Sequence, residues 1–122
     1  MRILHLEDDP ADAALVEALL RGEGFDCRVT RAASRQEFVA GLEAGPDIIL
    51  ADYSLPGFDG IVAQRLAREL RPDVPFVFVS GTMGEEVAID RLKDGATDYV
   101  LKHRLQRLGA ALRRALAEAE ER

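Results

Sequence analysis

Residues 47–60 have the sequence Asp47-Ile48-Ile49-Leu50-Ala51-Asp52-Tyr53-Ser54-Leu55-Pro56-Gly57-Phe58-Asp59-Gly60. The apolar run that begins at Ile48 has no polar break before Asp52, which is typical of a strand buried on both faces of a sheet. The turn-forming residues Leu-Pro-Gly follow, and Asp59-Gly60 then opens a helical pattern. The stretch therefore predicts a central strand of an α/β sheet, with Asp52 at the edge where such sheets bind ligands.

Outward from this stretch, short apolar segments alternate with helical patterns along the whole chain. The predicted strands cover residues 3–6, 25–30, 48–52, 76–79 and 99–101, the second of them as an edge strand. The predicted helices follow Asp9-Pro10, Ser34, Asp59 and Gly84, and a final helix covers about 104–122. Alternation of this kind indicates a parallel sheet with helices on both faces. The prediction is one α/β domain over residues 1–122, doubly wound, with five strands and five helices.

Apolar residues at helical spacing define the expected buried faces of these helices. They are Leu15, Val16, Leu19 and Leu20; Phe38, Val39 and Leu42; Ile61, Val62, Leu66 and Leu70; and Leu105, Leu108, Leu112 and Leu116.

Composition narrows the class of protein. The 122 residues carry a net charge of −6, which argues against a nucleic-acid-binding surface. No apolar run approaches the roughly 20 residues of a membrane helix, and no signal peptide is expected because Arg2 leads straight into a strand. Cys27 is the single cysteine, so an intrachain disulfide and a cysteine metal cluster are excluded. We expect a cytoplasmic protein without direct contact to nucleic acid or membrane.

Polar residues follow four of the predicted strands: Glu7-Asp8, Asp52, Ser80 and Lys102. In a parallel sheet these strand ends meet at one edge, so carboxylates, a hydroxyl and an ammonium group gather there. Two carboxylates about 4 Å apart repel by roughly 4 kcal/mol at an effective dielectric constant of about 20. A cation would offset this repulsion, and oxygen ligands with open positions suit Mg²⁺.

With these residues at its strand ends, the chain resembles the receiver domains of bacterial two-component signalling over essentially its whole length. The matching motifs are Ile3-Leu4-His5-Leu6-Glu7-Asp8-Asp9, Asp52-Tyr53-Ser54-Leu55-Pro56-Gly57-Phe58-Asp59-Gly60, Val79-Ser80-Gly81 and Gly95-Ala96-Thr97-Asp98-Tyr99-Val100-Leu101-Lys102. The resemblance implies the flavodoxin-like strand order 2-1-3-4-5. It also implies a phosphorylation switch that changes the surface around helix four, strand five and helix five.

The resemblance implies roles for individual residues. Asp52 would be the phosphoacceptor, receiving its phosphoryl group from a histidine of a sensor histidine kinase or a phosphotransfer protein. Mg²⁺, or Mn²⁺ in its place, would bind Glu7, Asp8, Asp52 and the backbone carbonyl of Ser54, with Asp8 as the more direct ligand and Glu7 acting partly through water. Lys102 and the switch hydroxyl Ser80 would hold phosphoryl oxygens, and Tyr99 would be the switch aromatic. Ser54 and Thr82 would tune the lifetime of the phosphoryl group.

Several residues have a structural interpretation beside the functional one. Asp9 is expected to cap a helix rather than bind metal. His5 is expected to be a packed, hydrogen-bonded core residue, and Tyr99 fits a core role as well as a switch role. His103 stands where receivers usually have proline, and a trans Lys102–His103 peptide is the default.

Two other functions stay open at this stage: a Mg²⁺-dependent phosphohydrolase with Asp52 as nucleophile, and a flavodoxin-like binding module. The chain is expected to be no enzyme beyond slow self-dephosphorylation. It would be a stand-alone regulator, or the receiver part of a hybrid kinase or multidomain regulator. The uncapped end of the final helix fits continuation into a linker, and homodimerisation stays open.

Overall fold

The computed structural model describes residues 1–81 and 84–121, and strands and helices alternate along them. The strands are β1 (Arg2–Leu6), β2 (Arg28–Ala32), β3 (Ile48–Ala51), β4 (Phe76–Ser80) and β5 (Asp98–Leu101). The α-helices are α1 (Pro10–Gly22), α2 (Arg35–Glu43), α3 (Gly60–Leu70), α4 (Glu85–Lys93) and α5 (Leu108–Glu120), with a 3₁₀ segment η1 (Lys102–Arg107) before α5. None of these helices is long and apolar enough to cross a membrane.

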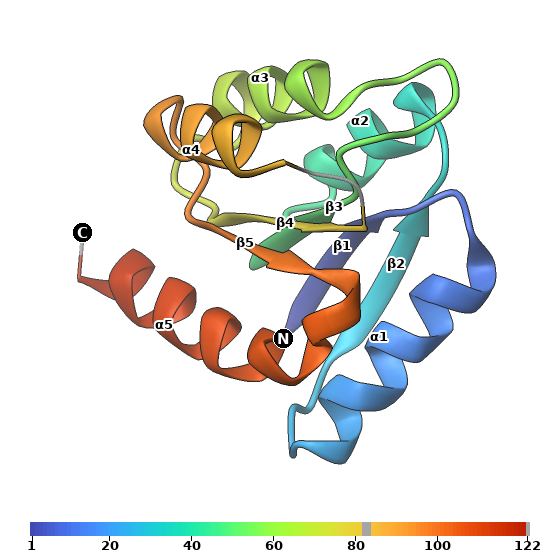
Figure 1. Cartoon of the computed structure of the whole chain (residues 1–122), viewed down its shortest axis with the longest axis vertical. Coiled ribbons are helices and arrows are strands. Elements are labelled where there is room, and N and C mark those ends of the chain that lie inside the picture. Colours follow the sequence, from blue (N-terminus) through green and yellow to red (C-terminus); the bar gives the residue numbers. More distant parts are fainter. Residues whose placement is uncertain (82–83, 122) are drawn as a thin grey trace.

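The five strands form one parallel sheet in the order β2-β1-β3-β4-β5. Helices α2, α3 and α4 lie on one face of the sheet and α1 and α5 on the other (Figure 1). This confirms the predicted doubly wound fold. Because every strand runs the same way, the residues that follow β1, β3, β4 and β5 all lie at one edge of the sheet.

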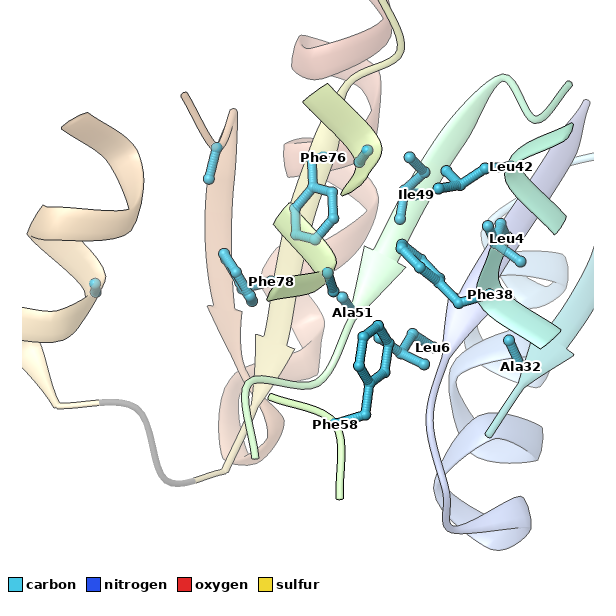
Figure 2. Packing of buried hydrophobic residues seen from close by; sticks show 14 residues of the cluster. Leu4, Leu6, Ala32, Phe38, Leu42, Ile49, Ala51, Phe58, Phe76 and Phe78 are labelled. Carbon is cyan, nitrogen blue, oxygen red and sulfur yellow. The ribbon is translucent and has the colours of Figure 1, made fainter. Parts of the chain in front are cut away.

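Each face of the sheet carries its own hydrophobic core. The core under α2, α3 and α4 contains four phenylalanines, with ring centroids 5.8 Å apart for Phe38 and Phe58 and 4.9 Å apart for Phe76 and Phe78 (Figure 2). The core under α1 and α5 is aliphatic, with Val16, Leu20, Leu108 and Leu112 among its buried members. Burial on both faces explains why β3 and β4 are apolar without a break.

The helix caps agree with the sequence predictions. The Asp9 side chain accepts a hydrogen bond from Ala11 N at 2.9 Å, so Asp9 is the N-cap of α1. Ser34 Oγ accepts from Glu37 N at 3.2 Å, and Glu37 Oε1 accepts in return from Ala33 N at 2.8 Å. The bonds to Asp9 and Ser34 satisfy donors that a helix start leaves without an intrahelical partner, and the bond to Glu37 satisfies a donor just before the cap.

Two of the predicted helix faces are wrong in part. Leu15 is 55% exposed, and Leu70 at the end of α3 is 44% exposed. The inner stripe of α3 consists of Gly60, Ala63, Gln64 and Ala67, which are small except for the glutamine. Small residues allow α3 to lie close to the sheet, and its larger apolar residues then flank the contact instead of making it.

The strands β1, β3, β4 and β5 agree with their predicted bounds to within one residue, whereas β2 and the final helix differ by more. β2 begins at Arg28 rather than residue 25, because the chain after α1 still turns: Phe25 N donates to Leu20 O at 3.0 Å. The predicted final helix is divided into η1 and α5, and Arg104 within η1 has non-helical angles (φ −133°, ψ 43°). Across the described part of the chain every peptide bond is trans, including Lys102–His103.

Candidate functional site

Backbone hydrogen bonds bring Asp52 beside the residues that follow β1. Asp52 N donates to Leu6 O and Glu7 N donates to Ala32 O, both at 2.9 Å, so the sheet ladder continues past the strand ends. Asp52 is only 7% exposed and Glu7 only 1% exposed, whereas Asp8 is exposed. A buried carboxylate thus sits at the carboxyl edge of the sheet, as predicted.

The loop after β3 fixes Asp52 from the other side. Asp52 Oδ1 accepts a hydrogen bond from Ser54 N at 3.2 Å, and Gly60 N donates to Tyr53 O at 2.9 Å. A Cβ at Gly60 would lie 2.9 Å from Phe78 Cε1 and 3.0 Å from the Tyr53 backbone, so only glycine lets the loop return this closely. The loop therefore depends on the Asp-Gly pair that opens α3.

Lys102 follows β5 and reaches into the carboxylates. Its Nζ donates to Asp12 Oδ2 at 2.8 Å and to Asp52 Oδ2 at 2.9 Å. It also lies 2.7 Å from Glu7 Oε1 as an ion pair. Burial lowers the pKa of Lys102, but the hydrogen bonds that Lys102 donates, led by the one to Asp12, outweigh burial and raise this pKa above its ordinary value. Lys102 is therefore a permanent positive charge at this edge.

Glu7 is held mainly by charge. Its Oε2 accepts from Asp9 N at 3.2 Å, but no group in the described residues directs a hydrogen bond at the buried Oε1. At an effective dielectric constant of about 20, the contact with Lys102 is worth about 6 kcal/mol, and Asp52, within 4.8 Å, repels by at least about 3 kcal/mol. Burial of a charge costs several kcal/mol more. Burial accordingly raises the pKa of Glu7, and Lys102 only partly offsets this.

Glu7, Asp8 and Asp52 suit a divalent cation. Each offers a carboxylate oxygen, and the three oxygens lie within 4.8 Å of one another. The buried Glu7 Oε1, which contacts Lys102 Nζ as an ion pair, is an anionic ligand atom that a cation would also stabilise. An all-oxygen set of this kind suits Mg²⁺.

The remaining predicted site residues lie around this cluster. Ser80 ends β4 and is 1% exposed, and it pairs in register with Leu101, directly before Lys102. Tyr99 is half-buried in β5 and packs against the core under α2, α3 and α4. Ser54 is exposed in the loop after β3. Thr82 lies outside the described residues.

Two residues near the site differ from expectation. His5 is fully buried, as predicted, but within the described structure neither ring nitrogen has a hydrogen-bond partner, so the expected hydrogen bonding is wrong. Burial, and next the charge of Lys102, lower the pKa of His5 to about 4. Asp12 was not predicted as part of the site. The only signal for it is an acid in the first turn of the helix after β1, a position that the helix dipole alone explains.

Residues 3–113 match a known protein family. A family model described as "Response regulator receiver domain" matches residues 3–113. The DNA-binding response regulator MtrA of Mycolicibacterium smegmatis is 41% identical over 103 residues, covering 83% of this chain and 43% of MtrA. The transcriptional regulatory protein ZraR of Salmonella typhimurium is 33% identical over 121 residues, covering 98% of this chain and 27% of ZraR. The chain thus spans less than half the length of either relative.

Solved structures of receiver domains have the same fold as this chain. A CheY-like response regulator receiver domain protein from Methanospirillum hungatei superposes with a TM-score of 0.85 at 30% identity, covering 98% of this chain and 96% of that one. The receiver domain of sensor histidine kinase PA1611 from Pseudomonas aeruginosa, solved with a magnesium ion coordinated in its active site cleft, has a TM-score of 0.80 at 31% identity. It covers 95% of this chain and 97% of that one.

Proposed function

Since this chain belongs to the response regulator receiver domain family, we propose that it accepts a phosphoryl group on Asp52 and passes the signal on by a change of its surface. One observation carries the proposal: a buried carboxylate at the end of β3 lies 2.9 Å from Lys102 Nζ, beside two further carboxylates. The family makes a histidine of a sensor histidine kinase or phosphotransfer protein the expected donor.

In the proposed reaction an oxygen of Asp52 attacks phosphorus. A phosphorus–oxygen bond forms, the bond from phosphorus to the donor imidazole nitrogen breaks, and its electron pair stays on that nitrogen. The ammonium group of Lys102, a compact cation, would bind a phosphoryl oxygen. Ser80, close to Lys102 along the β4–β5 pair, would donate a hydrogen bond to another oxygen. The chain is then a phosphoacceptor rather than an enzyme with turnover.

Glu7, Asp8 and Asp52 would hold Mg²⁺, or Mn²⁺, together with the backbone carbonyl of Ser54. The metal would supply neutralisation of charge on the transferring phosphoryl group. The magnesium in the receiver domain of PA1611 supports this assignment. Asp9 is left out of the ligand set because its carboxylate caps α1.

The proposed switch starts from the added charge of roughly −1.5 to −2 and three acceptor oxygens. Ser80 and Lys102 would move toward these oxygens, Tyr99 would turn inward, and the face formed by α4, β5 and α5 would change. Ser54 and Thr82, two residues beyond Asp52 and Ser80, would tune the lifetime of the phosphoryl group. The names of MtrA and ZraR suggest gene regulation as the output, in a protein longer than the matched region.

The direct test uses radiolabelled acetyl phosphate with Mg²⁺. We expect label on the unmodified chain and none on Asp52→Asn. Asp59→Asn is the matched control, because Asp59 is an exposed acid in the same loop whose capping of Val62 N an asparagine can reproduce. Label on Asp52→Asn would refute the assignment, and sustained turnover of a phosphoester would point to a phosphohydrolase.

A further inference from the structure

Asp12, in helix α1, is the third acidic residue whose carboxylate contacts Lys102. It lies in the first turn of α1, and its Oδ2 accepts from Lys102 Nζ at 2.8 Å, with the Asp12 side chain 39% exposed and that of Lys102 23% exposed. An acid three residues after an N-cap commonly reaches back to the backbone N–H of the cap. Here Asp9 N instead donates to Glu7 Oε2, which leaves the Asp12 carboxylate to Lys102.

The other two carboxylates that contact Lys102, those of Glu7 and Asp52, would also bind the cation. Glu7 Oε1 touches Lys102 without a directed hydrogen bond, and Glu7 and Asp52 both belong to the cluster that suits a cation. A divalent cation in that cluster would draw both carboxylates toward itself. Asp12 is not a member of the cluster, so its hydrogen bond to Lys102 would remain.

We propose that Asp12 is a positioning residue: it holds the Lys102 ammonium over Asp52 while Glu7 and Asp52 turn to the cation. The inference rests on the proposed phosphoacceptor function and adds to it a residue that acts only through Lys102. Without Asp12, the long lysine side chain would lose the one hydrogen bond that it makes outside the cation cluster among the described residues. It would then sample other rotamers at the moment of phosphoryl transfer.

The first test follows the ammonium group itself. The sequence has two lysines, Lys102 and Lys93, and Lys93 is exposed on α4, so it serves as an internal reference. With ¹⁵N-lysine, the Lys102 ammonium of the unmodified protein should exchange its protons slowly, with and without Mg²⁺. In Asp12→Leu the exchange should accelerate several-fold once Mg²⁺ is present. In Asp12→Asn, whose amide oxygen still accepts a hydrogen bond, it should accelerate less.

Exchange at Lys102 that is equally slow in Asp12→Leu and in the unmodified protein with Mg²⁺ would overturn the proposal. So would fast exchange in the unmodified protein. Backbone amide spectra of each variant confirm that it is folded, and Asp12→Asn provides the conservative case should Asp12→Leu fold poorly.

The second test separates positioning from charge. Labelling of Asp12→Leu by acetyl phosphate with Mg²⁺ should be roughly two- to fivefold slower, the range for a partly exposed ion pair. Loss of a negative charge alone would speed the approach of an anionic donor, so unchanged or faster labelling overturns the proposal. Glu17→Gln is the control for lost charge, because Glu17 is an acid of the same helix that pairs with Arg21, and it should label at the unmodified rate or slightly faster. If the unmodified chain takes no label, the proposed function fails, while the exchange measurement still decides the role of Asp12.

Discussion

Replacing His5 with leucine is expected to stabilise the protein at neutral pH and to flatten its loss of stability toward acid. His5 lies in β1, fully buried, between Arg31 and Leu50 in the strand register. Within the described residues both of its ring nitrogens lack a hydrogen-bond partner. A buried polar group in this state costs about 1–3 kcal/mol, which an apolar side chain of similar size avoids.

The pH dependence follows from the pKa of His5, which burial lowers from 6.5 to about 4. Between these values the unfolded chain binds a proton that the folded protein does not, so stability falls as the pH falls. The difference between the two pKa values corresponds to about 3 kcal/mol of unfolding free energy, at about 1.4 kcal/mol for each pKa unit. About 2 kcal/mol of this is lost between pH 7.5 and pH 5.

Urea unfolding of both proteins at pH 7.5, 6.5, 5.8 and 5, without metal, measures the effect. The difference in unfolding free energy between His5→Leu and the unmodified protein should grow by about 2 kcal/mol over this range. Taking the difference removes the contributions of titrating groups common to both proteins. A difference that stays constant across the range would refute the account of His5.

The sequence has two histidines, and the second provides the control. His103 is exposed in η1, so His103→Leu should change the unfolding free energy at pH 7.5 by less than about 0.5 kcal/mol.

Three further predictions concern the site and its support. Mg²⁺ at about ten times its dissociation constant should raise the unfolding free energy by about 1.4 kcal/mol; a chelator should reverse this, and Asp8→Asn should abolish most of it. Because burial raises the pKa of Glu7 above 4.5, its charge opposes folding increasingly as the pH rises past that value. Without metal, the unfolding free energy of Glu7→Gln relative to that of the unmodified protein should therefore rise from pH 4.5 to 8, and a difference in urea unfolding that stays constant would contradict this. Gly60→Ala should cost about 1–3 kcal/mol in urea unfolding, because its Cβ would press on Phe78 and the Tyr53 backbone; Gly22→Ala, with open space among the described atoms, should cost nothing.

The sequence predicted those features that depend on one dominant pattern. The uninterrupted apolar runs of β3 and β4 are short, which favours strands covered on both faces over helices, and a carboxylate that follows such a strand lies at the edge of the sheet. The strand order came from the family resemblance, since alternation alone leaves several orders open. The Asp9 and Ser34 caps were predictable because their hydrogen bonds are local.

Features that depend on the distance between elements were not predictable. The inner stripe of α3 has the same helical spacing as its apolar residues, and only the close approach of α3 to the sheet selects Ala63 and Ala67 over Leu70. Asp12 joins the site because Lys102, ninety residues later, reaches back to it. The missing hydrogen bonds of His5 are equally a property of the packed interior.

The most direct test of the central claim is to locate the phosphoryl group. After labelling with acetyl phosphate and Mg²⁺, borohydride reduces an aspartyl phosphate to homoserine, and peptide mass spectrometry finds the altered residue. Homoserine is expected at position 52 in the unmodified chain and in Asp59→Asn. Homoserine at another aspartate, or label that resists borohydride because it sits on a serine or histidine, would contradict this expectation.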